Sequence, residues 1–282
     1  MRSSATPPGW AWSDVEVAVP RPARRLPGIS MAGFRQLAAV RWDIAMVAHP
    51  SVTLLIDLSE GDGAVYHTDG RARRGSVVVG LLPGDLRAAA RARVDCLQIR
   101  LEPAVAAAML GASAELTGTV VALGEIWGRE AGRVEDRLRA AGSWAERFAI
   151  AEEILGRRPP ARRIDPEVAY AWRRALRSQG RLRVDSLAGE VGWSRERLWS
   201  RFRSQLGITP KRAARLVRFD HAAHLLATGG APAGVAAESG YVDQSHLHRE
   251  TMALAGLTPT AVAAAPWLAI DDVAWPVAAD RP

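Results

Sequence analysis

The sequence has little cysteine and no long apolar run. Cys96 is the only cysteine among 282 residues, which excludes an internal disulfide, a cysteine-rich zinc site and a cysteine-based methyl-acceptor site. Apolar runs such as 52–56 and 77–82 fall far short of the roughly 20 residues that span a membrane. The first residues carry no cationic and then apolar signal. We therefore expect a cytoplasmic protein with no membrane contact.

Cys96 lies in an alternating run, 94–99, that predicts a strand. A reactive thiol needs a helix N-terminus or a cationic neighbour, and the local sequence supplies neither. We expect a buried and inert thiol.

The basic residues are concentrated in one segment. Residues 157–260 contain 18 basic and nine acidic residues, a balance of +9, whereas the rest of the chain balances at −2. Lys211 is the only lysine, so nearly all of this positive charge is arginine. Because neutralised phosphates supply the largest sequence-independent part of nucleic-acid affinity, the asymmetry predicts a polyanion-binding domain. A solvated cationic surface is the alternative.

The N-terminal part favours strands. The expected strands are short, β-branched or alternating, and separated by Gly, Pro and Asp: 15–19, 51–58, 63–67, 76–82 and 94–101. This pattern is typical of a small barrel or a partial cupin-like sheet. Helices are expected at 104–110, 126–140 and 144–155. Arg71, Arg73 and Arg74 are expected on a solvated loop, with a contact to DNA or a partner as the alternative.

The predicted fold is therefore α+β. Residues 1–156 form a β-rich domain with helices, and 157–165 form a linker with two prolines and four arginines that remain solvated. Residues 166–264 form an all-α domain, and 265–282 form a tail that is either docked or disordered.

The helical segment contains an internal duplication. Residues 187–192 match 235–240 at an offset of 48, and after a turn one residue longer, 194–198 match 243–247 at an offset of 49. Gly207-Ile208-Thr209-Pro210 then matches Gly256-Leu257-Thr258-Pro259 at the same offset. Each copy has a short helix, a glycine turn, an N-cap (Ser194 or Asp243) and a second helix closed by glycine, as in a helix-turn-helix motif.

The second helix of each copy has a core stripe and a free face. Leu198 and Phe202, with Val191 on the first helix, are expected inside. The side chains expected over base edges are Glu196, Trp199, Ser200 and Arg203 in the first copy and Gln244, Ser245, His248 and Arg249, followed by Met252, in the second. The side chains expected at phosphates are Arg195, Arg197, Lys211, Arg212, Arg218 and His246.

A third helix joins the copies. It begins at Thr209-Pro210 and ends before Gly229-Gly230. Its about 18 residues span roughly 27 Å, which could hold two recognition helices near the 34 Å between successive major grooves on one face of DNA.

The tandem motif resembles the DNA-binding domain of AraC/XylS-type transcriptional regulators over about residues 165–264. The resemblance is carried by Asp243-Gln244-Ser245-His246, by Arg249 and by the two Gly-x-Thr-Pro closures. It implies a seven-helix domain that binds promoter DNA, a divergent N-terminal domain for effector sensing or dimerisation, and RNA polymerase as a further partner. Leu116-Thr117 through Gly128 is similar to a subgroup with a poorly characterised β-rich N-terminal domain. Ser200 stands where many relatives have arginine, and Thr251 where they have an aromatic residue, which predicts a less tightly packed second motif.

Several histidine and aromatic residues are also candidates for a metal site or an effector pocket. His246 and His248 are two apart on a helix, so their side chains diverge and a shared metal is disfavoured against a groove or phosphate role. The alternative of an enzyme tethered to DNA would need a metal ion bound by His49 and His67. The sequence lacks the clustered histidines and the carboxylate that such a catalytic site requires. Trp42, Tyr66 and His67 are expected to pack in the core or a turn rather than line an effector pocket. We expect no metal, no cofactor and no catalysis, and keep a nucleic-acid binder without sequence preference as a rival.

Overall fold

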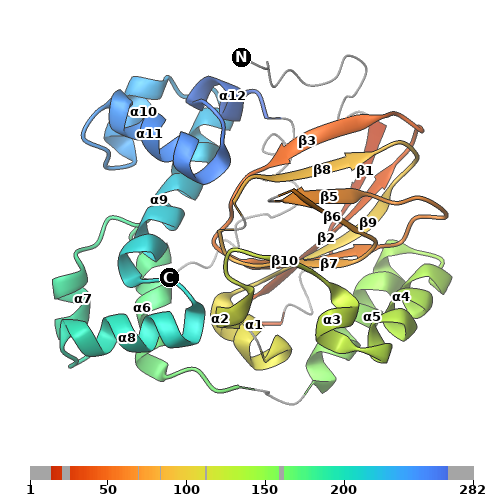
Figure 1. Ribbon diagram of the computed structural model, residues 1–282, viewed down its shortest axis with the longest axis horizontal. Coiled ribbons are helices and arrows are strands. Elements are labelled where there is room, and N and C mark those ends of the chain that lie inside the picture. Colours follow the sequence, from red (N-terminus) through yellow and green to blue (C-terminus); the bar gives the residue numbers. More distant parts are fainter. Residues whose placement is uncertain are drawn as a thin grey trace.

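The computed structural model describes residues 14–20, 26–68, 70–82, 84–111, 113–158 and 162–265. It confirms the α+β class, with an antiparallel β-sheet domain followed by helices that lie to one side of the sheets (Figure 1). Residues 159–161 of the expected linker and the tail from Pro266 lie outside the described residues.

The strands form two antiparallel sheets. The six-stranded sheet has the order β1-β2-β9-β4-β7-β10, and the four-stranded sheet has the order β3-β8-β5-β6. The strands of the described residues are β1 Val15–Ala18, β2 Ile29–Gln36, β3 Trp42–Met46, β4 Val52–Asp57, β5 Val65–Thr68, β6 Arg71–Arg74, β7 Val77–Val79, β8 Leu86–Ala90, β9 Asp95–Leu101 and β10 Val120–Ala122.

The larger sheet is buried on both faces. On central strand β4, Leu54 and Ile56 join the apolar cluster beneath the helices, whereas Leu55 joins the cluster between the sheets with Tyr66 and Val77. A strand covered on both sides reads as a largely apolar run, which agrees with the strand expected at 51–58.

Four further strands, β2, β3, β8 and β10, were not expected. β2 and β8 are rich in Ala, Gly or charged residues, so long-range pairing overrides their weak local preference. The expectation of a loop at Arg71, Arg73 and Arg74 was wrong, because these residues form edge strand β6 paired with β5. Arg73 lies 3.4 Å from Glu125, and Arg74 lies 3.8 Å from Asp62.

Cys96 lies on strand β9, as expected, and is half-buried. Burial raises the pKa of its thiol, with help from the nearby Asp57 carboxylate, which agrees with an inert thiol.

Helices follow strand β9 along the chain, and strand β10 lies between the second and the third of them. Those of the N-terminal part are α1 Pro103–Leu110, α2 Ser113–Leu116, α3 Leu123–Trp127, α4 Arg129–Ala140 and α5 Trp144–Arg157. The single helix expected at 126–140 was wrong: the chain breaks at Gly128, whose φ of 57° is left-handed backbone that glycine adopts at little cost.

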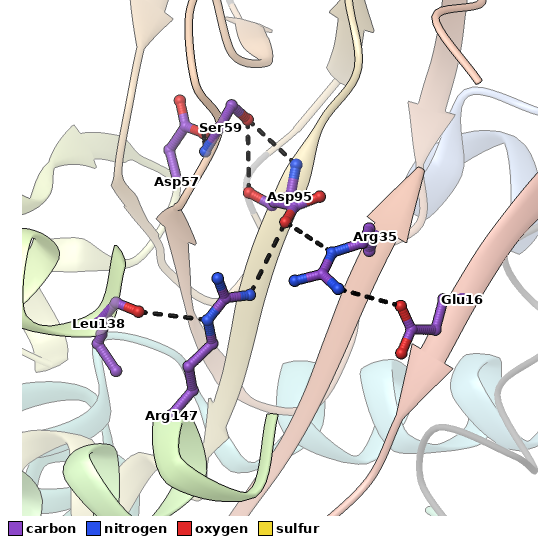
Figure 2. Close-up of polar contacts among 7 residues, drawn as sticks. All are labelled: Glu16, Arg35, Asp57, Ser59, Asp95, Leu138 and Arg147. Atoms are coloured by element: carbon purple, nitrogen blue, oxygen red, sulfur yellow. Dashed lines mark hydrogen bonds and ion pairs between the residues drawn. The ribbon is translucent and has the colours of Figure 1, made fainter. Parts of the chain in front are cut away.

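An ionic cluster ties α5 to the sheet (Figure 2). The Asp95 carboxylate accepts from Arg35 Nε at 2.9 Å and lies 3.7 Å from Arg147 Nη1, while Arg35 also reaches Glu16 at 3.4 Å. Arg147 Nε donates to the Leu138 carbonyl at 3.2 Å, and burial lowers the pKa of this guanidinium. A buried arginine needs this carboxylate, so the cluster fixes where α5 lies on the sheet.

The remaining helices form the C-terminal part: α6 Pro166–Arg177, α7 Val184–Glu190, α8 Arg195–Leu206, α9 Pro210–Ala227, α10 Pro232–Glu238, α11 Gln244–Ala255 and α12 Pro259–Ala263. One of the four linker arginines, Arg158, is less solvated than expected, with a side chain that is 17% exposed, whereas that of Arg162 is 37% exposed. Arg158 lies over the Trp127 ring at 4.0 Å and pairs with Glu130 at 2.7 Å, and Arg162 pairs with Glu115 at 3.2 Å.

Candidate nucleic-acid interface

Two helix-turn-helix motifs lie at opposite ends of α9, with α7 and α8 near its start and α10 and α11 near its end (Figure 1). The caps are those expected from the sequence. Ser194 and Asp243 accept from the backbone N–H of Arg197 and His246, and Gly207 and Gly256 close the helices in left-handed backbone. Local chemistry therefore sets both ends of both recognition helices.

The inner face of each motif is buried. Ala188 meets Leu198 and Phe202 in the first copy, and Phe202 packs on Trp172 of α6 with ring centroids 6.4 Å apart. In the second copy Thr251 replaces the aromatic residue, is fully buried and donates to the Leu247 carbonyl at 2.7 Å. A small residue at this position is thus accommodated inside the motif, with its hydroxyl paired.

The outer faces are free. The exposed side chains are Glu196, Trp199, Ser200 and Arg203 on α8 and Gln244, Ser245, His248, Arg249 and Met252 on α11. Trp199 is 44% exposed although it is a large apolar residue, and Arg203 lies 5.3 Å from its ring. Two short rows of exposed side chains, one on α8 and one on α11, are therefore available to a partner.

Four of the six expected phosphate ligands are exposed: Arg195, Arg197, Lys211 and Arg212. Arg195 pairs with Asp185 at 2.9 Å, and Arg197 lies over the Trp193 ring at 4.5 Å. His246 is half-buried, packs edge-on against Tyr241 at 5.2 Å and accepts from the Val242 N–H at 3.5 Å.

Arg218 lies elsewhere than expected. Its side chain is 20% exposed, 3.7 Å from Glu250 and 4.9 Å from the Tyr241 ring. Burial, with the nearby Glu250 carboxylate, raises the pKa of Tyr241 to about 12. The guanidinium of Arg218 therefore serves the interior of the second motif rather than an open surface.

Glu250 is a positioning residue that the sequence analysis missed. Its carboxylate is 5% exposed and accepts from Arg215 Nε of α9 at 2.9 Å and 3.2 Å, which fastens α11 to the joining helix. Its partner is 35 residues away, so local spacing carried no signal of the pair.

The β-rich part touches recognition helix α8 and the joining helix α9. Thr117 donates to the carbonyl of Leu206, the last residue of α8, at 3.0 Å, and α2 packs on α8. Near α9, His49 Nε2 lies 3.4 Å from Asp220 and 2.8 Å from Arg100 Nη1. The N-terminal part is therefore in contact with the first motif and with the helix that joins the two motifs.

The residues considered for metal or effector binding do not converge. His67 is exposed, whereas Tyr66 is buried between the sheets, and Trp42 donates to Gln36 at 3.1 Å. Within the described part of the chain, no group of three or more His, Cys, Asp or Glu side chains is placed to hold a metal ion. None of the helices described here could cross a membrane by its length and apolarity.

Comparison with known proteins agrees with this geometry. Residues 187–265 match a family model described as a helix-turn-helix domain. No curated protein matches the chain by sequence. Among solved structures the chain is similar to ToxT from Vibrio cholerae O395 bound to (E)-4-(8-methylnaphthalen-1-yl)but-3-enoic acid, with 10% identity, a TM-score of 0.51 and coverage of 85% of this chain and 99% of that chain.

Two further likenesses are more distant. Unsaturated fatty acid bound ToxT from Vibrio cholerae strain SCE256 has 10% identity, a TM-score of 0.45 and coverage of 86% and 97%. The xylose-binding transcription activator XylR has 20% identity, a TM-score of 0.34 and coverage of 43% and 39%.

Residues 187–265, which contain the duplicated motifs with their exposed outer faces, thus form a helix-turn-helix domain.

Proposed function

We propose that the chain binds specific promoter sequences by placing α8 and α11 in two successive major-groove segments. The observation that carries this proposal is the paired arrangement of exposed faces at the two ends of α9. At 18 residues α9 is about 27 Å long, close to the groove repeat of roughly 34 Å.

The two recognition faces have different roles in this proposal. Glu196, Trp199, Ser200 and Arg203 read the first segment, and Gln244, Ser245, His248 and Arg249 read the second. Arg249 is the strongest candidate for guanine, because its exposed guanidinium can donate two hydrogen bonds to one base edge. In this proposal the side chains that contact phosphates are Arg195, Arg197, Lys211, Arg212 and His246. Arg218 is not among them, because its side chain is only 20% exposed.

Residues 1–156 serve as a sensor or oligomerisation module joined through 157–165 to the DNA-binding domain, 166–264. The contacts of Thr117 with α8 and of His49 with α9 support this role, because a change in the β-rich part has a direct route to the first motif and to the helix that joins the two motifs. The small acid bound in the ToxT structure makes a small-molecule effector a reasonable ligand class, with a second copy or RNA polymerase as further partners.

A mobility-shift titration tests the central proposal. A selection from random duplexes gives the preferred site, and this site should compete against scrambled DNA by about 10³-fold or more at physiological salt. Equal competition by both duplexes would support a binder without sequence preference and overturn the proposal.

The roles of single residues are separated by two variants. Arg249→Ala should lose discrimination at one or two base pairs, by about 1 to 3 kcal/mol, because a base contact is removed. Arg212→Ala is the matched control: it should weaken all duplexes alike and reduce the salt slope by about one. Identical base-substitution profiles for the two variants would contradict this assignment.

A further inference from the structure

The turn of the second motif carries an exposed valine that the first motif lacks. Between the turn glycine and the N-cap, the first copy has Trp193 alone, and the second has Tyr241 and Val242. Val242 is 87% exposed, more than any other large apolar residue in the described part of the chain. Because single exposed apolar residues are common, the argument rests on how this one is held.

The backbone on both sides of Val242 is fixed. Tyr241 is buried and its N–H donates to the Ala236 carbonyl at 2.8 Å, while Asp243 caps α11 by accepting from His246 N at 2.6 Å. The N–H of Val242 itself reaches His246 Nδ1 at 3.5 Å. The chain therefore holds an apolar side chain in water at a fixed place, where binding costs little ordering entropy.

That place is the N-terminal end of the second recognition helix. Helix-turn-helix proteins direct this end of the recognition helix at base edges, and Val242 precedes Ser245 of the outer face by three residues. In the major groove the apolar feature of a base edge is the thymine methyl group.

We propose that Val242 contacts the 5-methyl group of a thymine at the edge of the segment bound by α11. The inference rests on the proposed function, since it needs α11 in the major groove. It also predicts an asymmetry between the motifs. In the first copy Trp193 is half-buried and covered by the Arg197 guanidinium at 4.5 Å, so no equivalent side chain is free.

The test removes the methyl group alone. In the selected duplex each position of the α11 segment is set in turn to thymine or to deoxyuridine, on each strand, and the dissociation constant is measured for the full chain. The wild-type protein should bind about fourfold more weakly to deoxyuridine at one or two positions, the cost of one lost methyl contact.

Two variants identify the side chain responsible. Val242→Ala should bind the thymine and deoxyuridine duplexes almost equally at those positions. Leu37→Ala, which shortens an exposed apolar residue of the β-rich part outside both recognition faces, should retain the full difference. Because both side chains are exposed, both variants should unfold thermally as the wild type does, which a melting curve checks.

The outcomes separate the two proposals. Wild-type protein that prefers its selected duplex yet is indifferent to every deoxyuridine overturns the thymine contact alone. A full thymine preference in Val242→Ala does the same, because another residue must then read the methyl. Wild-type protein that binds the selected duplex no better than scrambled DNA overturns the proposed function, and the inference with it.

Discussion

The two helix-turn-helix copies have the same backbone arrangement, but different contacts hold their recognition helices in place. Both have a side-chain N-cap and a left-handed glycine at the end of the second helix. The first helix, α8, is held by apolar packing of Phe202 in the cluster that continues into the N-terminal part. The second, α11, belongs to a separate cluster and is held by the buried Glu250 carboxylate.

This difference teaches that a duplicated fold can keep its local chemistry while its long-range contacts diverge. Caps act within one turn of the chain, so they persist wherever the sequence repeats. Both recognition helices pack on α9, but α8 also packs on α6 and α2, whereas α11 is fastened to α9 by the Glu250–Arg215 pair. Substituting equivalent residues of the two copies in matched pairs tests this difference.

The largest effect is expected at the core position of α8. Phe202→Ala should lower the free energy of unfolding by about 3 to 5 kcal/mol, because it leaves a cavity beside Trp172. Thr251→Ala, at the equivalent position, should cost only about 1 to 2 kcal/mol, for a lost hydroxyl bond and a small void. Denaturant titration of both variants makes the comparison, and equal losses would show that the copies are packed alike.

The closing glycines should also differ. A side chain at either Gly207 or Gly256 meets a left-handed backbone penalty of about 1 to 2 kcal/mol. At Gly207 the added Cβ would also collide with the Ala114 carbonyl oxygen and with Thr117, whereas at Gly256 the nearest atom, of Asp85, lies at an ordinary 3.7 Å. Gly207→Ala should therefore cost about 1 to 2 kcal/mol more in denaturant titration than Gly256→Ala. A larger loss for Gly256→Ala would contradict the contact between α8 and the β-rich part.

The ion pairs at one repeat position form the third comparison. Glu250→Gln should cost about 2 kcal/mol, less than for a fully buried pair because Arg215 is 40% exposed. Arg201, at the equivalent position, pairs with Asp165 on the surface, so Arg201→Gln should cost at most about 1 kcal/mol.

The surface pair also predicts a pH dependence. Arg201 donates to Asp165 and lowers the pKa of that carboxyl below its ordinary 3.8. The stabilisation is present above the unfolded pKa and is lost as pH falls through the lowered folded value. The penalty of Arg201→Gln should therefore shrink below pH 3.8 in chemical unfolding, and a penalty that grew with acid would rule out this pair as its cause.

The smallest effect is expected from restoring symmetry to the reading faces. Ser200 stands where the second copy has Arg249, so Ser200→Arg should strengthen binding by about threefold to tenfold on duplexes with guanine opposite it. Ser186→Arg adds the same charge on exposed α7 and controls for electrostatics alone. Mobility-shift titrations should show a guanine-dependent gain in affinity only for Ser200→Arg. An equal gain in affinity for both variants would show that the added charge, and not a contact with guanine, is responsible.

Much of the helical part could be predicted because its signals are local. Ser194, Asp243 and Thr209 cap the helices that follow them, and the 18-residue joining helix runs from Pro210 as expected. The β-rich part was harder, because strands such as β8, with three alanines, form by pairing with distant chain. The same limit hid Glu250 and misplaced Arg218, whose surroundings come from three helices or turns at once.

The amino-acid sequence by itself determined the duplication, the caps, the glycine closures and the outward spacing of both recognition faces, since each depends on residues within a few positions of one another. Only the tertiary structure decided which arginines remain available to a phosphate, which carboxylate fastens α11 and where the β-rich part meets the two motifs. Those contacts join residues dozens of positions apart, and burial and pairing at such distances leave no periodic trace in the chain.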